Sequence, residues 1–441
     1  MSSSTFIDLR VNNAEQFKNS VTGTPNTKMF LVFGKIDSWA NDLSPDIANT
    51  SMNMMYEVWD NMIGGKRILG GDMYHVIPRH NWSSNTVYTA YDDKSTTLYD
   101  SNTIFYVMNS TYSVYKCIAN NYGKVSTIEP TSVNPEIVST TGDGYSWKYM
   151  YTVSDSEKLR FVTDAYIPVK TLTGDDGSLQ WQVQNTAISG AINNIVVTNS
   201  GNNYTNVSNI SIVITGDGSS ASAIPTVNTT TNTISSIVIT DSGKNYTYAT
   251  VSITDKGLGA GANARAIISP FNGHGTNPVY ELGGKNILIN AKLRYTEEGV
   301  LPVGNDYRQI AILKDPYYYN TEIPASNLAF VQALTLVCDG VGDFQSDEIV
   351  YQGTNFAQSS FSGKVVSWDS TTSKLLLINT KGTPTISQSV IGVTSFTTRV
   401  VTNYTNGTMK KFSGRLLYVD NIKPITRATD QIENFQILLK F

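Results

Sequence analysis

The 441-residue sequence has few of the residues on which catalysis, metal binding and covalent cross-linking depend. It contains two cysteines and three histidines, and 15% of its residues are charged, against about a quarter in an average soluble protein. Two cysteines exclude a disulfide-based scaffold. Because 32 Lys and Arg stand against 36 Asp and Glu, there is no basic excess to neutralise phosphates, and we expect no nucleic-acid partner.

Long apolar runs and a leader-like beginning are also missing. No stretch approaches the roughly 18 continuous apolar residues of a membrane-spanning helix. The first ten residues, MSSSTFIDLR, lack a basic segment followed by an apolar one. These absences predict no membrane partner and a protein that is made in a cytoplasm and stays soluble there. With 40% hydrophobic residues, the chain is expected to fold rather than to be disordered.

Ser, Thr, Asn, Gly and Tyr take the place of the missing charge, and their pattern is mainly that of β-strands. Short apolar runs are broken by Gly, Asn, Asp and Pro. The clearest predicted strands cover residues 28–33, 103–108, 112–118, 147–153, 287–295, 309–313 and 437–441. Helical spacing is limited to residues 51–63, which Gly64 and Gly65 are expected to end as a C-terminal cap, and to a weaker stretch over 14–21.

An internal repeat lies between about residues 188 and 269. Ile195-Val-Val-Thr-Asn-Ser-Gly-Asn-Asn-Tyr-Thr205 recurs 42 residues later as Ile237-Val-Ile-Thr-Asp-Ser-Gly-Lys-Asn-Tyr-Thr247. Each copy continues into a second predicted strand (211–215 and 251–254) and a segment rich in Gly, Ala and Ser. Each copy is expected to form a small antiparallel module. The two modules are expected to stack, because one buries too little surface alone.

A second block, at residues 332–411, has a different pattern. Four strand-like runs follow one another there at a spacing of about 11 to 15 residues, which is typical of a small barrel or sandwich. They cover residues 348–353, 363–368, 374–378 and 390–394. Because the flanking sequence differs in character, both blocks are interpreted as insertions.

Candidate catalytic motifs are weak. His75 and His80 are five residues apart across a proline, and His274 lies in a Gly-rich loop, so no zinc-site spacing is present. The segment 257–262 fits a relaxed dinucleotide-binding pattern. No long helix can follow it, because Pro270 comes too soon, and a β-turn is the better interpretation.

Acidic pairs and cysteines receive similar interpretations. The pairs Asp92-Asp93, Asp175-Asp176 and Asp347-Glu348 lack the spacing of a calcium loop and are interpreted as solvated turns. Apolar neighbours predict that Cys117 and Cys338 are buried rather than reactive. A chain of this size without a catalytic constellation is expected to be a structural or binding protein with no metal site.

Five segments resemble the baseplate wedge subunit family of contractile-tailed, T-even-type bacteriophages, the gene-product-eight type. They occur in the family's order and cover roughly residues 1–172, 280–330 and 412–441. The resembling segments are Phe30-Leu-Val-Phe-Gly-Lys-Ile-Asp-Ser-Trp39, Val76-Ile-Pro-Arg-His-Asn-Trp82, Gly142-Asp-Gly-Tyr-Ser-Trp-Lys-Tyr-Met150, the run from Leu301 through Arg308 to Pro316, and the run from Ser413 through Tyr418 to Phe441.

The resemblance implies a β-sandwich core with a few helices in long loops, to which the two small β modules are added. The predicted segments are a first core part at 1–180 with the helix near 51–63, the tandem repeat module at 186–272, a second core part at 280–330, the barrel-like module at 332–411 and C-terminal core strands at 412–441. The two modules depart from the shorter family pattern, so the resemblance implies no role for them. The candidate structural or interface residues are Trp39, Pro78, Arg79, Trp82, Gly142, Asp143, Gly144, Tyr145, Trp147, Tyr149, Arg308 and Tyr418.

The same resemblance implies a structural subunit of a virion tail baseplate. It implies a homodimer attached to other wedge proteins, with no enzymatic activity and no cofactor. Arg79 and Arg308 are expected to bind carboxylates of a neighbour, the alternative being that Trp147, Tyr149 and Arg308 stabilise their own fold. Two other functions stay open: a receptor- or glycan-binding tail protein that uses the Tyr-rich repeats, and a tail-associated glycan hydrolase that uses Asp143 or Asp175.

Overall fold

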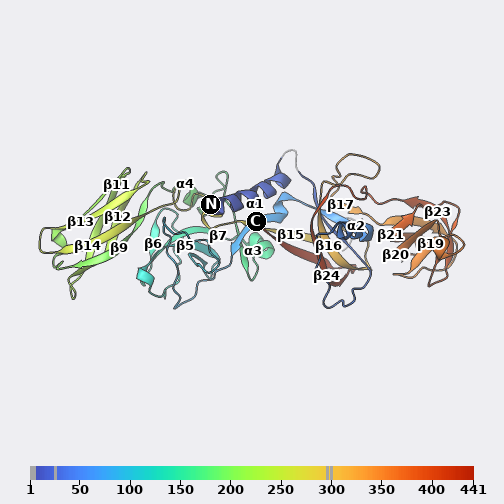
Figure 1. Cartoon of the computed structure of the whole chain (residues 1–441), viewed down its shortest axis with the longest axis horizontal. Helices are drawn as coiled ribbons and strands as arrows, with labels where there is room; N and C mark the ends of the chain where they lie inside the picture. The colour runs from blue at the N-terminus through green and yellow to red at the C-terminus, as the bar shows by residue number, and fades with distance from the viewer. Residues whose placement is uncertain (1–5, 24–26, 295–296, 298–300) are drawn as a thin grey trace. The chain divides into compact units, whose positions relative to one another are not determined.

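The computed structural model describes residues 6–23, 27–294, 297 and 301–441 (Figure 1). The chain divides into two compact units. Unit 1 comprises Met1–Gln16, Tyr74–Leu288 and Leu438–Phe441, and unit 2 comprises Phe17–Met73 and Ile289–Ile437. The described residues form 25 strands and five α-helices, which confirms the predicted mainly β fold. The β-sandwich core and the five segment boundaries stay predictions.

Unit 1 contains a four-stranded antiparallel sheet that is buried on both faces. Its order is β4 (Tyr106–Met108), β5 (Ser113–Asn120), β7 (Tyr145–Thr152) and β6 (Val138–Thr140). A bulge at Met150 shifts the register, so that Tyr149 and Tyr151 pack in different apolar clusters. Double-sided burial explains why these strands have near-continuous apolar sequences instead of alternating ones.

Unit 1 contains three short helices and the first part of a long one. They are α1 (Ile7–Thr22), α3 (Asp155–Phe161), α4 (Leu179–Asn185) and α5 (Pro278–Glu281). The weak prediction of a helix at 14–21 corresponds to α1, which begins seven residues earlier. At α3, the Ser154 hydroxyl and the Glu157 carboxylate form a capping box that satisfies the first N–H groups of the helix.

A further sheet has the order β25 (Ile432–Lys440), β15 (Asn286–Arg294), β3 (Met73–Pro78) and β8 (Tyr166–Val169). The limits of the units fall within α1, β3, β15 and β25. In unit 1, Val76 of β3, Phe161 of α3 and Leu288 of β15 form one small apolar cluster. This cluster fixes the strand that leads into the segment 78–82. No described helix is both long and apolar enough to cross a membrane.

Unit 2 is built on a five-stranded sheet whose core is covered by α2 (Met52–Asn61). The strand order is β17 (Ala329–Val331), β2 (Met62–Ile68), β1 (Met29–Gly34), β16 (Asp306–Lys314) and β24 (Arg415–Thr426). The predicted helix is confirmed. It begins after Ser51, whose hydroxyl accepts a hydrogen bond from the Met54 N–H at 3.2 Å. Val58 and Trp59 face the core with Phe30 of β1.

The prediction that Gly64 and Gly65 cap this helix is wrong. Met62 has extended backbone angles and leads directly into β2, so both glycines lie within a strand. Glycine is needed there for close packing: a Cβ on Gly64 would lie 2.6 Å from the Phe330 carbonyl oxygen and 2.8 Å from Leu301 Cδ2. Close approach of β17, rather than a helix cap, therefore explains the pair.

The repeat forms six strands whose pairing mostly joins one copy to the other. The first copy supplies β9 (Ile192–Asn202), β10 (Ile210–Gly216) and β11 (Ser219–Asn228), and the second supplies β12 (Thr233–Lys244), β13 (Ala249–Asp255) and β14 (Ala260–Ile268). The antiparallel pairs β9·β14, β10·β13 and β11·β12 are nested. The expectation of two separately formed, stacked modules is therefore wrong, because each copy completes its strand pairing with the other.

In the second block, six strands close into a barrel. They are β18 (Leu334–Asp339), β21 (Lys374–Gly382), β20 (Phe361–Asp369), β19 (Ile349–Gln352), β22 (Ser389–Gly392) and β23 (Thr398–Thr405), in spatial order. Inward-facing residues such as Leu336, Val350 and Leu377 fill the interior. Closure leaves no unpaired strand edge.

Candidate functional site

The turn at residues 142–144 is held by one carboxylate. Gly144 has a φ of +84°, which glycine adopts at little cost. Burial opposes ionisation of Asp143, but the hydrogen bonds that its carboxylate accepts outweigh burial and lower its pKa to about 2. The donors are the hydroxyls of Thr141 and Ser126 and the N–H groups of Thr127, Ile128 and Tyr145. Asp143 is therefore a structural anchor of two loops.

The aromatic residues after this turn lie in the core of unit 1. Tyr145, Trp147 and Tyr149 are almost fully buried. The rings of Tyr145 and Trp147 are stacked at a centroid distance of 5.5 Å, and Tyr88 packs edge-on against Trp147 at 5.6 Å. The Tyr145 hydroxyl donates to the Lys124 carbonyl oxygen at 2.5 Å. This arrangement favours the alternative that these residues stabilise their own fold.

The segment 78–82 is more accessible. The Pro78 carbonyl accepts a hydrogen bond from the Tyr106 hydroxyl at 2.8 Å, and Arg79 donates to the Thr163 carbonyl oxygen at 3.0 Å. Arg79 and Trp82 are both partly exposed, and they line a shallow pocket of about 220 Å³. Pro78 is exposed as well, so a partner can reach this segment.

Arg308 of β16 is buried in unit 2, and its guanidinium binds groups of its own chain. It donates to both carboxylate oxygens of Asp42 at 3.1 Å and to the Ile36 carbonyl oxygen at 2.7 Å. The hydrogen bond from Arg308 lowers the pKa of Asp42. These contacts fasten the loop after β1 to the sheet. They favour a role within the fold over a contact to a neighbouring subunit.

Trp39 and Tyr418 lie in the same unit as Arg308. The Trp39 indole N–H donates to the Ile422 carbonyl oxygen at 3.1 Å, and the Lys35 ammonium lies 4.4 Å from its ring centroid. The Tyr418 hydroxyl donates to Asp420 at 3.1 Å. Burial and the Asp420 charge raise the pKa of Tyr418 to about 12. Both side chains are half-buried and therefore partly available to a partner.

A buried ionic cluster in unit 1 was not foreseen. The Lys116 ammonium lies 3.0 Å from a Glu281 carboxylate oxygen, and His274 Nδ1 lies 3.8 Å from the same oxygen. Burial opposes ionisation of Glu281, but Lys116 and His274 lower its pKa. Burial and the Lys116 charge lower the pKa of His274 to about 4. Because Lys116 and Glu281 are 165 residues apart in the chain, no local sequence signal could identify the pair.

The acidic residues that the sequence analysis singled out as pairs form ion pairs and turns. Arg265 binds Asp92 and Asp93, and the exposed Asp175 carboxylate accepts the Gly177 N–H at 2.8 Å. Within the described ranges, no group of three His, Cys, Asp or Glu residues could hold a metal ion. The two cysteines are free and buried, which confirms that prediction, and burial raises the pKa of Cys338 to about 11.

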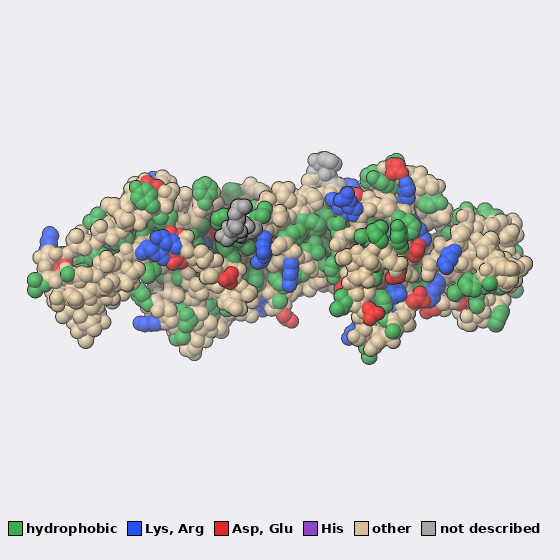
Figure 2. Space-filling model, in the orientation of Figure 1, with side chains coloured by type: hydrophobic (Ala, Val, Ile, Leu, Met, Phe, Trp, Pro, Cys, Tyr) green, Lys and Arg blue, Asp and Glu red, His purple; other side chains and the backbone are tan. Residues whose placement is uncertain are grey.

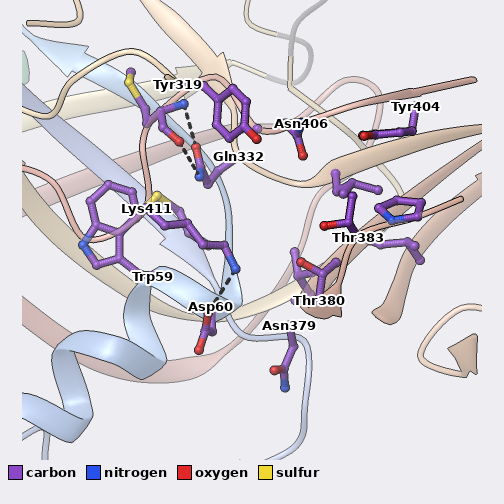
Figure 3. A pocket seen from close by; sticks show the side chains of 18 residues that line it. Trp59, Asp60, Tyr319, Gln332, Asn379, Thr380, Thr383, Tyr404, Asn406 and Lys411 are labelled. Carbon is purple, nitrogen blue, oxygen red and sulfur yellow. Dashed lines mark hydrogen bonds and ion pairs between the residues drawn. The ribbon is translucent and has the colours of Figure 1, made fainter. Parts of the chain in front are cut away.

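Unit 2 has a polar pocket of about 270 Å³ where the barrel meets α2 (Figure 3). Lys411 and Asp60 form an ion pair of 3.0 Å at its wall. The Gln332 side-chain amide is held by two hydrogen bonds to the main chain of Met409, each 3.0 Å long. The charged groups at this site pair with each other, so the pocket contains no free acid–base pair. None of the predicted interface residues lines it.

Exposed apolar side chains gather over α2, as Figure 2 shows. Met52, Tyr56 and Phe412 are 60%, 48% and 52% exposed. The rings of Tyr56 and Phe412 pack edge-on at 5.1 Å. Aromatic and methionine side chains are enriched at protein interfaces. This surface, which we call the α2 patch, is therefore suited to contact another protein.

These observations define a mainly β protein in which most of the motif residues maintain the fold. The family model described as "Bacteriophage T4, Gp8" matches residues 3–127. The chain is similar to the baseplate wedge protein gp8 of Enterobacteria phage T4, with 23% identity over 211 residues. This match covers 38% of the chain and 63% of the relative. The predicted resemblance to the gp8-type wedge family is thus confirmed.

Proposed function

We propose that this chain is a structural subunit of a phage tail baseplate wedge. The observation that carries the proposal is the match of residues 3–127 to the Gp8 family, together with motifs that continue in the family's order through Tyr418. The proposed location is the virion tail, reached after synthesis in the host cytoplasm. The protein acts without catalysis, as a homodimer that also binds other wedge proteins.

The proposed mechanism is mechanical. Arg308 and Asp143 hold loops in one arrangement, so surface groups are presented to neighbours without an ordering cost at assembly. The α2 patch, Arg79 and Trp82 are accessible groups that suit such contacts. Packed interfaces switch between discrete arrangements rather than deforming continuously. A wedge held by preorganised interfaces can therefore persist until contraction and then repack.

Cryo-electron microscopy of intact baseplates from the phage that encodes this chain tests the proposal. We expect density for the closed barrel and for the interleaved repeat at the wedge, with two copies in contact. A complementary measurement is the mass of the purified chain by light scattering, which is expected to equal two protomers. Baseplates that lack the chain altogether would overturn the proposal.

Glycan binding by the repeat module is the second candidate. The tyrosines on which it would depend are buried. Tyr204 and Tyr246, the repeated tyrosines, are only 2% and 5% exposed. Each hydroxyl accepts a main-chain N–H of the facing copy, from Ala262 and Ala221 respectively. Exposed rings that could stack on sugars are thus reduced, although Tyr248 stays accessible. Binding of the full chain to host polysaccharide would revive this candidate.

A glycan hydrolase is the third candidate. It would use Asp143 or Asp175 as catalytic carboxylates. Both carboxylate oxygens of Asp143 accept hydrogen bonds from neighbouring loops, and the Asp175 carboxylate accepts the Gly177 N–H in a turn. A turnover assay with Asp175→Asn separates the candidates: a hydrolase loses activity, whereas a structural subunit has none to lose.

A further inference from the structure

Unit 1 contains a pocket of about 370 Å³ that combines aromatic walls with positive charge. It lies at the end of β3, directly after which come Arg79 and Trp82. Phe105, Tyr106 and Tyr99 contribute ring surfaces, and Phe105 packs edge-on against the other two at 5.1 and 5.6 Å. This packing makes the walls rigid, so the pocket is formed before any ligand arrives.

Three cations from distant parts of the chain line the same pocket. Arg10 lies on α1, Lys285 follows α5, and Lys440 ends β25. Within the part of the chain that the structure describes, none of their side chains has an ion pair or a hydrogen bond. One acidic side chain, Asp100, lines the pocket with them. The protein as a whole has a net charge of −4, so this local excess of positive charge is not a general property of its surface.

The cations affect one another. Burial lowers the pKa of Lys285, and the Arg10 charge lowers it further, while Asp100 opposes the change. Lys285 is half-buried, whereas Arg10 and Lys440 are exposed. The cluster therefore consists of one deep ammonium group and two groups at the rim, and their like charges repel one another. An anion that enters relieves this repulsion.

We propose that this pocket binds an acidic segment of a neighbouring protein subunit. A carboxylate lies against Lys285, a second acidic side chain contacts Arg10 or Lys440, and an apolar residue of the segment packs on Phe105 and Tyr106. Three cations suit a few carboxylates rather than the many phosphates of a nucleic acid. Several pocket residues, Arg10 among them, lie within the family-matched range 3–127. The inference rests on the proposed function for the existence of the neighbour.

Zero-length cross-linking of intact phage particles with a carbodiimide tests this contact, because the reagent joins only amines and carboxylates that touch. Mass spectrometry is expected to find Lys285 or Lys440 joined to Asp or Glu of another chain. Lys256, an exposed lysine of the repeat module without an ion pair, is the internal comparison. Particles that contain the chain but show no such products at Lys285 and Lys440 would overturn the inference and leave the proposed function intact.

The purified full-length chain provides a test that needs no baseplate. The probe is a fluorescein-labelled peptide of alternating Glu and Phe, whose binding is followed by anisotropy. The double variant Arg10→Glu, Lys285→Glu is expected to bind about ten-fold more weakly, and Lys256→Glu is expected to bind like the wild type. Salt is expected to weaken the wild-type binding. Equal affinity for all three proteins, or no binding by the wild type, contradicts the inference even if the chain is found in the baseplate.

Discussion

Replacement of Asp143 by Asn tests how the turn at 142–144 stabilises unit 1. The carboxylate accepts five hydrogen bonds, and Asn offers only one acceptor oxygen. One carboxylate oxygen accepts three of these hydrogen bonds and the other accepts two. Whichever oxygen the NH₂ group of Asn replaces, two or three donors lose their partner. Hydrogen bonds to a charged group contribute about 1.5–3 kcal/mol each when fully desolvated. The site is half-exposed, and solvent screening reduces this figure.

The pKa of Asp143 sets the expected magnitude. Lowering from 3.8 to about 2 corresponds to about 2 kcal/mol in favour of the ionised folded state. With screening at a half-exposed site, we expect Asp143→Asn to cost about 1–2 kcal/mol. Because the folded-state pKa lies below the unfolded one, this stabilisation is present above about pH 4 and is lost as the pH falls from about 4 to about 2.

Hydrogen exchange at the amides of Thr127 and Ile128 measures the effect locally. After correction for intrinsic rates, protection of these amides in the wild type is expected to fall between pH 4 and pH 2, and in Asp143→Asn to be low throughout. Asp175→Asn is the matched control: it removes one exposed turn hydrogen bond and is expected to change stability by less than about 0.5 kcal/mol. Equal protection in wild type and Asp143→Asn, or an equal loss in the control, would refute the reasoning.

Three further substitutions test other parts of the fold, each by denaturant unfolding of the purified chain. Trp147→Ala is expected to cost about 3–5 kcal/mol, because it empties the centre of a buried aromatic cluster; a cost below 1 kcal/mol would contradict this packing. Gly64→Ala is expected to cost about 1–3 kcal/mol through the clash with the neighbouring strand, whereas Gly71→Ala, with no atom within 4 Å of the added Cβ, serves as the control and stays within about 0.5 kcal/mol. Arg308→Lys keeps the charge but loses the paired N–H groups directed at Asp42, and we expect the free energy of unfolding to fall by about 2 kcal/mol. An unchanged free energy of unfolding would contradict the role of Arg308 within the fold.

Local sequence was enough for the elements whose stability is local. The spacing of apolar residues predicts α2, and short apolar runs predict β1 and β16. The two copies of the repeat are visible because the same strand and turn residues recur after 42 positions. In each case the residues that determine an element lie within that element.

Local sequence failed where residues distant in the chain decide the outcome. Gly64 and Gly65 follow a helix and match a cap pattern, yet their role depends on a strand more than 260 residues away. The tyrosines that recur in the repeat are of the residue type that binds glycans, and the sequence left that function open. Only the pairing of β9 with β14 and of β11 with β12 shows that they form the core between the copies.

By itself, the sequence determined the fold class, the poverty in charge, the repeat and the resemblance to wedge proteins. Each of these follows from composition, period or the order of motifs. The tertiary structure alone decided which motif residues are buried, and it brought Lys116 to Glu281 and gathered Arg10, Lys285 and Lys440 around one pocket. The physical reason is that burial and the distance between charges depend on how distant segments pack. The residues next to a position in the sequence do not show that packing.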